Sequence, residues 1–173
     1  MRIGIVSDTH DQEASVRTAL ELLRQRGVEL LLHCGDIESP ATVQLFRGLP
    51  THFVWGNWDG VPTHTRAGVK HRDYSRLREA IAGIGGTVQE PFGHLELAGR
   101  DIAWVHGHDR KLRQELEEMD YFDYLFYGHT HAAEQHRTGR TLVVNPGALF
   151  RARPRQFAVL DLDSGAVESV VVR

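Results

Sequence analysis

The chain contains 173 residues, of which 41% are hydrophobic and 25% charged, and its formal net charge is −3. This length and composition exclude a disordered or fibrous protein, and we expect one globular domain over residues 1–173. The balanced charge gives no case for a nucleic-acid surface, and no stretch approaches a signal peptide or the roughly 20 apolar residues of a membrane span, so we expect a cytoplasmic protein.

The first third of the chain alternates between apolar runs and helix-type patterns. Residues 2–6 are nearly all apolar, which is typical of a strand that is buried on both faces of a sheet. A helix is expected to follow Asp11, because its carboxylate can cap the first turn. Such strand–helix alternation predicts a parallel sheet. The expected strands are residues 2–6, 28–33 and 51–55, and the expected helices are residues 11–26 and 41–46.

The rest of the chain is predicted to be mostly strands, with two further helices. Residues 60–72 show no clear periodicity and are expected to form a long loop. Asp109 can cap a helix that carries Leu112, Leu116 and Met119 on one face. The remaining expected elements are a helix over residues 73–84 and strands over residues 87–90, 93–97, 101–105, 123–127, 133–138, 141–144, 156–162 and 166–172.

Polar side chains follow the expected strands at the point where each strand ends. Because the carboxyl ends of parallel strands meet at one edge of a sheet, we expect these side chains to lie close together. They are carboxylates, an amide and imidazoles, which suit Mn²⁺, Fe, Zn²⁺, Co²⁺ or Ni²⁺ better than Ca²⁺ or Mg²⁺. They are too many for one ion, whereas two ions about 3.5–4 Å apart can clamp a phosphoester. The residues are Asp8, His10, Asp36, Asn57, His106, His108, His129 and His131.

These residues belong to short motifs whose order resembles that of a known family. The chain resembles the calcineurin-like metallophosphoesterases, in their small single-domain prokaryotic phosphodiesterase branch. The resemblance covers nearly the whole chain and implies an α/β fold, a four-layer αββα sandwich with two mixed β-sheets flanked by helices. The motifs are Asp8-Thr9-His10, Gly35-Asp36, Gly56-Asn57-Trp58-Asp59, His106-Gly107-His108, Gly128-His129-Thr130-His131, Asn145-Pro146-Gly147-Ala148 and Pro154-Arg155.

The resemblance also implies a role for each of these side chains. It implies a cofactor of two divalent ions, Mn²⁺ in the first place, with Ni²⁺, Fe, Co²⁺ or Zn²⁺ as alternatives. The implied reaction is hydrolysis of a small phosphodiester by a hydroxide held between the metals, with Asp36, Asn57 and His108 as catalytic residues. The implied ligands are Asp8, His10, Asp36 and His131 for the first ion, and Asp36, Asn57, His106 and His129 for the second.

One position departs from the wider family. That family often has a histidine directly after the asparagine, as a proton donor to the leaving group, whereas this chain has Trp58. His108, His64 or His71 would then be the candidates for a general acid. Trp58 itself either lines the pocket or packs against the fold.

The sequence leaves the choice of substrate and partner open. One alternative is a phosphomonoesterase or nucleotidase of the same fold. Another is a non-catalytic protein-binding scaffold, which is the role of a eukaryotic relative in a membrane-trafficking coat. The 60–72 segment and the arginines Arg151, Arg153 and Arg155 are candidates for substrate selection. Since relatives of this branch are often homo-oligomers, a homo-oligomer is one expected state.

Overall fold

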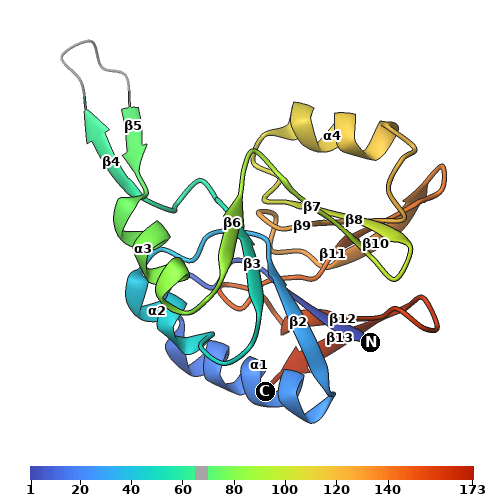
Figure 1. Ribbon diagram of the computed structural model, residues 1–173, viewed down its shortest axis with the longest axis horizontal. Coiled ribbons are helices and arrows are strands. Elements are labelled where there is room, and N and C mark those ends of the chain that lie inside the picture. Colours follow the sequence, from blue (N-terminus) through green and yellow to red (C-terminus); the bar gives the residue numbers. More distant parts are fainter. Residues whose placement is uncertain (65–69) are drawn as a thin grey trace.

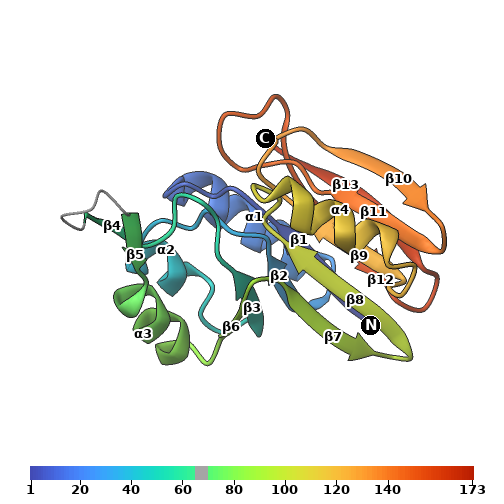
Figure 2. The ribbon, with the colours of Figure 1, turned by 90° about the horizontal axis from the view of Figure 1, so that it is seen from above.

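Two mixed β-sheets lie face to face in the computed structural model, and helices cover their outer faces (Figure 1, Figure 2). The structure describes the backbone of residues 1–64 and 70–173, and within these ranges all side chains except those of residues 63, 64, 70 and 71. Among the described residues, no helix combines the length and the apolar content that crossing a membrane requires.

The larger sheet has six strands in the order β13-β12-β1-β2-β3-β6. Strands β1, β2, β3 and β6 run parallel to one another, and β12 and β13 are antiparallel additions at one side. The carboxyl ends of β1, β2 and β3 therefore meet at one edge. The strands are β1 (Arg2–Val6), β2 (Val28–His33), β3 (Thr51–Val54), β6 (Thr87–Gln89), β12 (Arg155–Asp161) and β13 (Ala166–Val172).

The smaller sheet has five strands in the order β10-β11-β9-β8-β7. Its three central strands are parallel and its outer strands antiparallel, so the carboxyl ends of β8 and β9 also lie together. The strands are β7 (Gly93–Leu97), β8 (Arg100–Val105), β9 (Tyr124–Tyr127), β10 (Glu134–Thr138) and β11 (Thr141–Asn145).

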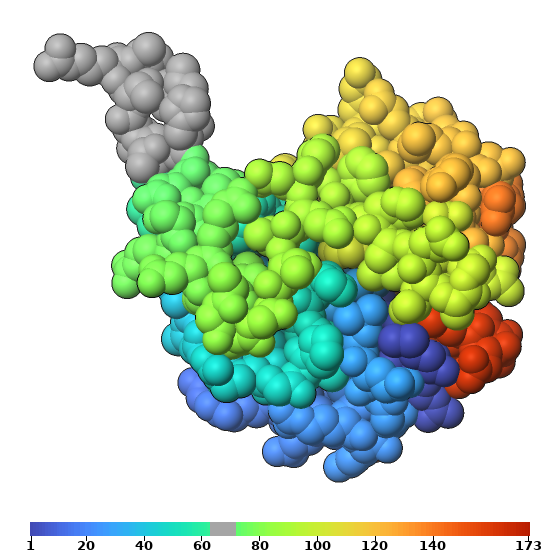
Figure 3. All heavy atoms as spheres, in the orientation of Figure 1, coloured from blue at the N-terminus to red at the C-terminus, as the bar shows by residue number. Residues whose placement is uncertain are grey.

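Three separate clusters of buried side chains hold these layers together. The cluster between the sheets joins Ile5 and Leu32 to Trp104 and Phe126, and all four are fully buried. Outside the larger sheet lie α1 (Glu13–Gln25), α2 (Pro40–Leu45) and α3 (Ser75–Gly83), which bury the apolar faces expected from the sequence. Outside the smaller sheet lies α4 (Arg110–Glu118), anchored by Leu116. Figure 3 shows one face, on which the N-terminal elements of the larger sheet (blue to green) and its C-terminal strands (red) adjoin the smaller sheet (yellow to orange).

Three local predictions are wrong. The expected loop contains paired strands, β4 (Val61–His64) and β5 (Lys70–Asp73), whose ladder forms a projecting hairpin; residues 65–69 lie outside the described residues. Asp11 does not cap α1, since its carboxylate instead accepts hydrogen bonds from the Ser39 and Thr42 hydroxyls at the start of α2. Met119 is 59% exposed, because it follows the last turn of α4 and no longer faces the sheet.

Candidate metal centre

The predicted site residues lie on the loops that follow β1, β2, β3, β8 and β9. Many of these residues have positive φ: 52° at Asp8, 41° at His10, 59° at Asp36, 68° at His129 and 58° at His131. Side chains other than glycine rarely adopt this conformation, and it persists only where the surroundings enforce it. Five residues with this strained backbone conformation lie in these loops. We infer that the fold enforces it because it points their side chains toward one another.

Backbone hydrogen bonds hold the first two loops against each other. The Asp8 N–H donates to the Gly35 carbonyl at 3.1 Å, and the His10 N–H donates to the Asp36 carbonyl at 3.1 Å. Close approach is also required at Gly56, where a Cβ would overlap the Asp36 carboxylate. The loop after β3 can therefore lie against Asp36 only with glycine at position 56.

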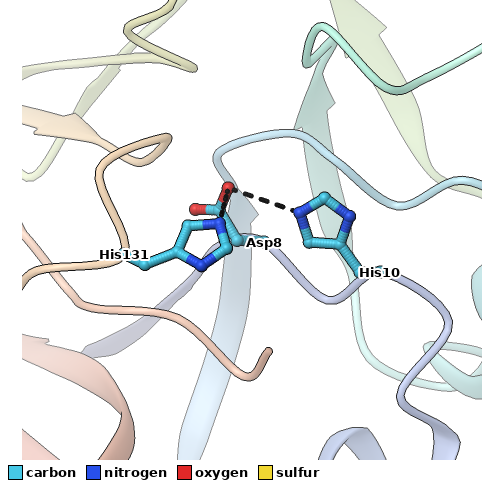
Figure 4. A group of neighbouring side chains, drawn as sticks. All are labelled: Asp8, His10 and His131. Atoms are coloured by element: carbon cyan, nitrogen blue, oxygen red, sulfur yellow. Dashed lines mark ion pairs between the residues drawn. The ribbon is translucent and has the colours of Figure 1, made fainter. Parts of the chain in front are cut away.

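One half of the cluster consists of Asp8, His10 and His131 (Figure 4). The Asp8 Oδ1 atom lies 3.2 Å from His131 Nε2 and 3.9 Å from His10 Nε2. The other carboxylate oxygen, Oδ2, accepts hydrogen bonds from the Ser7 hydroxyl at 2.6 Å and from the His129 N–H at 3.0 Å. Asp8 is thus fixed by one oxygen while the other faces the two imidazoles.

The Asp36 carboxylate lies between this half and a second one. Its Oδ2 atom is 3.4 Å from His10 Nε2 and 3.3 Å from His106 Nε2. Its Oδ1 atom accepts a hydrogen bond from the Trp58 N–H at 2.8 Å. On the far side, Asn57 Oδ1 lies 3.0 Å from His106 Nε2. One oxygen of Asp36 thus lies within 3.4 Å of an imidazole nitrogen from each half.

The remaining two predicted histidines lie around His106. The His129 ring centroid is 5.1 Å from that of His106, and the His108 centroid is 5.4 Å from it. His106 is buried, whereas His108 and His129 are exposed. All eight strand-end residues therefore gather in one place, with His108 at the rim. His64 and His71 lie outside the described side chains.

Hydrogen bonds outside the cluster orient its two buried imidazoles. The Nδ1 atom of His10 lies 2.5 Å from the Glu38 carboxylate, and Nδ1 of His106 lies 2.8 Å from the Cys34 carbonyl. Because both partners are acceptors, Nδ1 donates a hydrogen bond in each ring, and Nε2 is the nitrogen that faces the cluster. Glu38 was not predicted as a site residue. The sequence marks it only as an acidic residue two positions after Asp36.

Asp59 holds the loop that carries Asp36. Its buried carboxylate accepts backbone N–H groups from Asp36 (2.9 Å), Ile37 (2.6 Å), Glu38 (2.9 Å) and Gly56 (2.7 Å). The loops after β2 and β3 are therefore tied through one side chain. Asp59 positions Asp36 and does not itself face the imidazoles.

The electrostatics of the second half keep Asp36 ionised. Burial raises the pKa of Asp36, but the hydrogen bond and charge of His106 and the Trp58 N–H outweigh burial and bring it below its usual value. Burial likewise lowers the pKa of His106, and the Asp36 hydrogen bond and charge reverse this and raise it. A ligand of a metal ion must be deprotonated, and Asp36 meets this condition at neutral pH.

The histidines nearer the surface differ in their surroundings. The adjacent Asp8 carboxylate raises the pKa of His131. Burial, followed by the charge of His106, lowers the pKa of both His108 and His129. His108 is therefore a neutral imidazole at neutral pH, with one N–H donor.

The cluster fits divalent metal ions. Asp8 Oδ1 and His10 Nε2 are buried, lie 3.9 Å apart and make no well-formed hydrogen bond within the described part of the chain, although His131 Nε2 lies 3.2 Å from Asp8 Oδ1. Buried polar atoms without partners are costly, and a bound cation would satisfy both. Two groups, Asp8 with His10 and His131, and Asp8 with Asp36 and His106, each have ligand atoms within 4.8 Å of one another. Carboxylate and imidazole together suit first-row transition metals.

Comparisons with known proteins agree with the site and the fold. The sequence matches the calcineurin-like phosphoesterase superfamily domain over residues 1–165. Phosphodiesterase MJ0936 of Methanocaldococcus jannaschii is 29% identical over 150 residues, which cover 85% of this chain and 83% of that protein. The probable metallophosphoesterase YsnB of Bacillus subtilis is 25% identical over 175 residues, which cover 96% of this chain and 87% of that protein.

Among solved structures, that of an archaeal phosphodiesterase superposes on this chain with a TM-score of 0.86, at 26% identity and with 99% of both chains covered. The predicted four-layer fold is therefore confirmed, and so is the prediction of a phosphoester-hydrolysing enzyme. The family model spans every strand-end residue of the cluster. This chain belongs to the calcineurin-like phosphoesterase superfamily.

Proposed function

We propose that this protein is a phosphodiesterase that works with two divalent metal ions. The observation that carries the proposal is the place of Asp36, whose Oδ2 atom lies 3.4 Å from His10 Nε2 and 3.3 Å from His106 Nε2. A carboxylate between two imidazoles of separate groups is suited to be shared by two ions. The unpartnered atoms of Asp8 and His10 support ligand roles for both.

The ligand assignment follows the two halves of the cluster. In this proposal Asp36 takes part in both sites. The first ion is held by Asp8, His10, Asp36 and His131, and the second by Asp36, Asn57, His106 and His129. Mn²⁺ is the proposed native metal, with Ni²⁺, Fe, Co²⁺ and Zn²⁺ as alternatives that the same donors accept.

Bound ions of this kind acidify a water molecule and neutralise the negative charge that develops on the phosphate. The protein's own residues hold the reactants in position and exclude other orientations of them. Asp36 is fixed by the hydrogen bond from the Trp58 N–H, so its carboxylate needs no rearrangement when substrate arrives. His108, at the rim, would donate its single N–H to an oxygen of the phosphate or of the leaving group.

The preference for a diester rests on two points. MJ0936 and the archaeal protein of known structure are both named phosphodiesterases. In addition, Trp58 occupies the position after Asn57, where the wider family often has a histidine that donates a proton to the leaving group. A small phosphodiester is therefore the proposed substrate. A cytoplasmic location, a single domain over residues 1–173 and a homo-oligomeric state stay predictions of the sequence.

The test is hydrolysis of bis(p-nitrophenyl) phosphate beside p-nitrophenyl phosphate. Chelator-stripped protein is re-supplied with Mn²⁺, Ni²⁺, Zn²⁺ or Mg²⁺ in turn. We expect turnover only with metal, and a higher kcat/KM for the diester. A higher kcat/KM for the monoester would favour the phosphatase alternative, and protein that binds two ions without any turnover would favour the scaffold alternative.

A further inference from the structure

Two cavities border the candidate metal centre, one beside each half. The Trp58 cavity, of about 270 Å³, lies beside His10 and His131. The Trp55 cavity, of about 370 Å³, lies beside His108, whose ring neighbours those of His106 and His129. Asp36 lies between the two halves, 3.4 Å from His10 Nε2 and 3.3 Å from His106 Nε2. A phosphate group bound at the centre would therefore have a cavity on each side.

The Trp58 cavity is lined by aromatic and imidazole rings, by the Arg151 guanidinium and by the Glu38 carboxylate. The Phe150 ring lies 4.7 Å from the His10 ring, and the Arg151 guanidinium lies 4.8 Å over Phe150. The Trp58 side chain is 61% exposed, although its backbone is fixed by the hydrogen bond to Asp36. A large apolar surface left in water beside a polar centre marks a binding surface, and flat rings favour stacking on a planar group.

The Trp55 cavity is apolar and carries acidic groups. The Trp55 ring stacks on Tyr74 at 4.6 Å and 17°. Of the described residues that line this cavity, none is lysine or arginine, whereas Glu90 and Asp109 are carboxylates. Arg78, which lies over the Trp55 ring, pairs with Glu90 at 2.8 Å, so the cavity is mostly apolar and close to neutral and suits an uncharged group. The other lining residues are Pro91, Val105 and Leu112.

We propose that these cavities bind the two ester groups of an acyclic phosphodiester: a planar aromatic group against Trp58 and Phe150, and an uncharged group against Trp55 and Leu112. This inference rests on the proposed phosphodiesterase function and names its substrate class. A cyclic diester carries both ester oxygens on one organic group, so it fills one cavity only. An acyclic diester with two organic groups fills both.

The test compares two diesters that differ in one ester group and release the same product. Bis(p-nitrophenyl) phosphate has two aromatic groups, whereas methyl p-nitrophenyl phosphate has one. Trp58→Ala removes the wall of one cavity, and its exposure makes the change harmless to folding. Leu112→Trp narrows the other cavity. Tyr121→Ala is the matched control, because Tyr121 is a 50% exposed aromatic that lines neither cavity.

Trp58→Ala is expected to lower kcat/KM for the bis-aromatic diester about fivefold to tenfold, as loss of an aromatic contact does. Leu112→Trp should also lower it, because the narrowed cavity no longer admits the second ring. On the methyl ester, only Trp58→Ala should have an effect of this size, because the single aromatic group lies against Trp58 and the small methyl group still fits the narrowed cavity. Calorimetric binding of diphenyl phosphate should weaken about fivefold in Trp58→Ala, independently of turnover. Tyr121→Ala should match the wild type throughout.

Other outcomes overturn the inference in distinguishable ways. If the metal-loaded wild type hydrolyses both diesters but neither cavity variant changes kcat/KM, or both change it by the same factor on both substrates, the two-cavity assignment is wrong and the proposed function stands. If Leu112→Trp fails to fold, Trp58→Ala and the calorimetry decide alone, and unchanged binding of diphenyl phosphate overturns the assignment. If the wild type hydrolyses neither diester, both proposals fail together.

Discussion

At the scale of single residues, the Asp36 carboxylate is the group on which the proposed centre depends. It faces His10 and His106 with one oxygen and is held by the Trp58 N–H at the other. Asp36→Asn should abolish turnover, with a loss larger than the about 100-fold that an outer hydrogen-bond partner costs. Metal analysis of the same variant should show fewer than two ions per chain.

The control for this change is Asp163→Asn, which alters an 84% exposed carboxylate that pairs with the N-terminal amine. It should keep wild-type turnover and metal content. Near-normal diester hydrolysis by Asp36→Asn would contradict the ligand assignment, because loss of a shared ligand must weaken both metal sites.

Glu38 is the positioning residue whose loss can be separated from a loss of folding. Its carboxylate lies 2.5 Å from His10 Nδ1 and leaves His10 Nε2 free for the cluster. Glu38→Ala should weaken Mn²⁺ binding about 10- to 100-fold, measured by isothermal titration calorimetry, while Glu38→Gln should recover part of it because the amide oxygen still accepts the Nδ1 proton. Equal Mn²⁺ affinity of Glu38→Ala and Glu38→Gln would show that Glu38 does not orient His10.

At the scale of elements, Asp59 and Asp123 show how side chains join neighbouring loops. Asp59 accepts N–H groups from the loops after β2 and β3. Asp123 accepts the Asp101 N–H at 2.9 Å and the Arg140 guanidinium at 3.1 Å, which joins the starts of β8, β9 and β11. Both carboxylates stabilise the fold at a distance from the proposed chemistry.

The Asp123 contacts predict a pH dependence of stability. Burial raises the pKa of Asp123, but the Asp101 N–H and the Arg140 and Arg100 guanidinium groups outweigh burial and hold it below its usual value. A folded-state pKa below the unfolded one gives stability that is present above about pH 4 and is lost as the pH falls through the folded pKa. Asp123→Asn should therefore lower the free energy of unfolding at pH 7, and the difference from wild type should shrink below about pH 4. Urea unfolding at both pH values measures it, and a difference that grows in acid would contradict this account.

The elements also show what sequence reasoning recovers. Apolar runs such as 2–6 and 28–33 are strands as predicted, because burial on a sheet imposes a pattern that the sequence carries. Asp109 caps α4 as predicted, through the N–H groups of Lys111 and Leu112. Asp11 also precedes a helix in the sequence, but its carboxylate accepts hydrogen bonds at the start of α2 instead of capping α1. Contacts across the fold decide which of these two partners it binds. The β4–β5 hairpin was missed because the sequences Val61-Pro62-Thr63-His64 and Lys70-His71-Arg72-Asp73 show no alternation of apolar and polar residues.

For the candidate site, strand-end motifs predicted all eight residues that gather in the structure. The sequence did not reveal which groups hold them. Glu38 beside His10 and the Cys34 carbonyl beside His106 act through atoms whose position depends on the folded loops. Backbone carbonyls carry no sequence signal, so such partners become visible only in three dimensions.

At the scale of the whole molecule, the proposed centre joins the two sheets. Asp8, His10 and Asp36 follow strands of the larger sheet, whereas His106 and His131 follow strands of the smaller one. Ions bound between them would link the sheets in the folded state only. Metal at 100 times its dissociation constant should raise the free energy of unfolding by about 2.7 kcal/mol for one site, and chelation should remove the gain.

Differential scanning calorimetry with and without Mn²⁺ checks this linkage. Asp36→Asn should show little of the rise in Tm, and Asp163→Asn should show all of it. An equal rise in both variants would mean that the ion stabilises the protein elsewhere.

The measurement that tests the central claim most directly is a titration of chelator-stripped protein with Mn²⁺, followed by hydrolysis of bis(p-nitrophenyl) phosphate. The protein concentration is kept well above the dissociation constant, so that added metal is bound. We predict that activity rises until two Mn²⁺ ions per chain are present and then stays level. Activity that is complete at one ion per chain, or that needs no metal, would contradict a centre shared by two ions at Asp36.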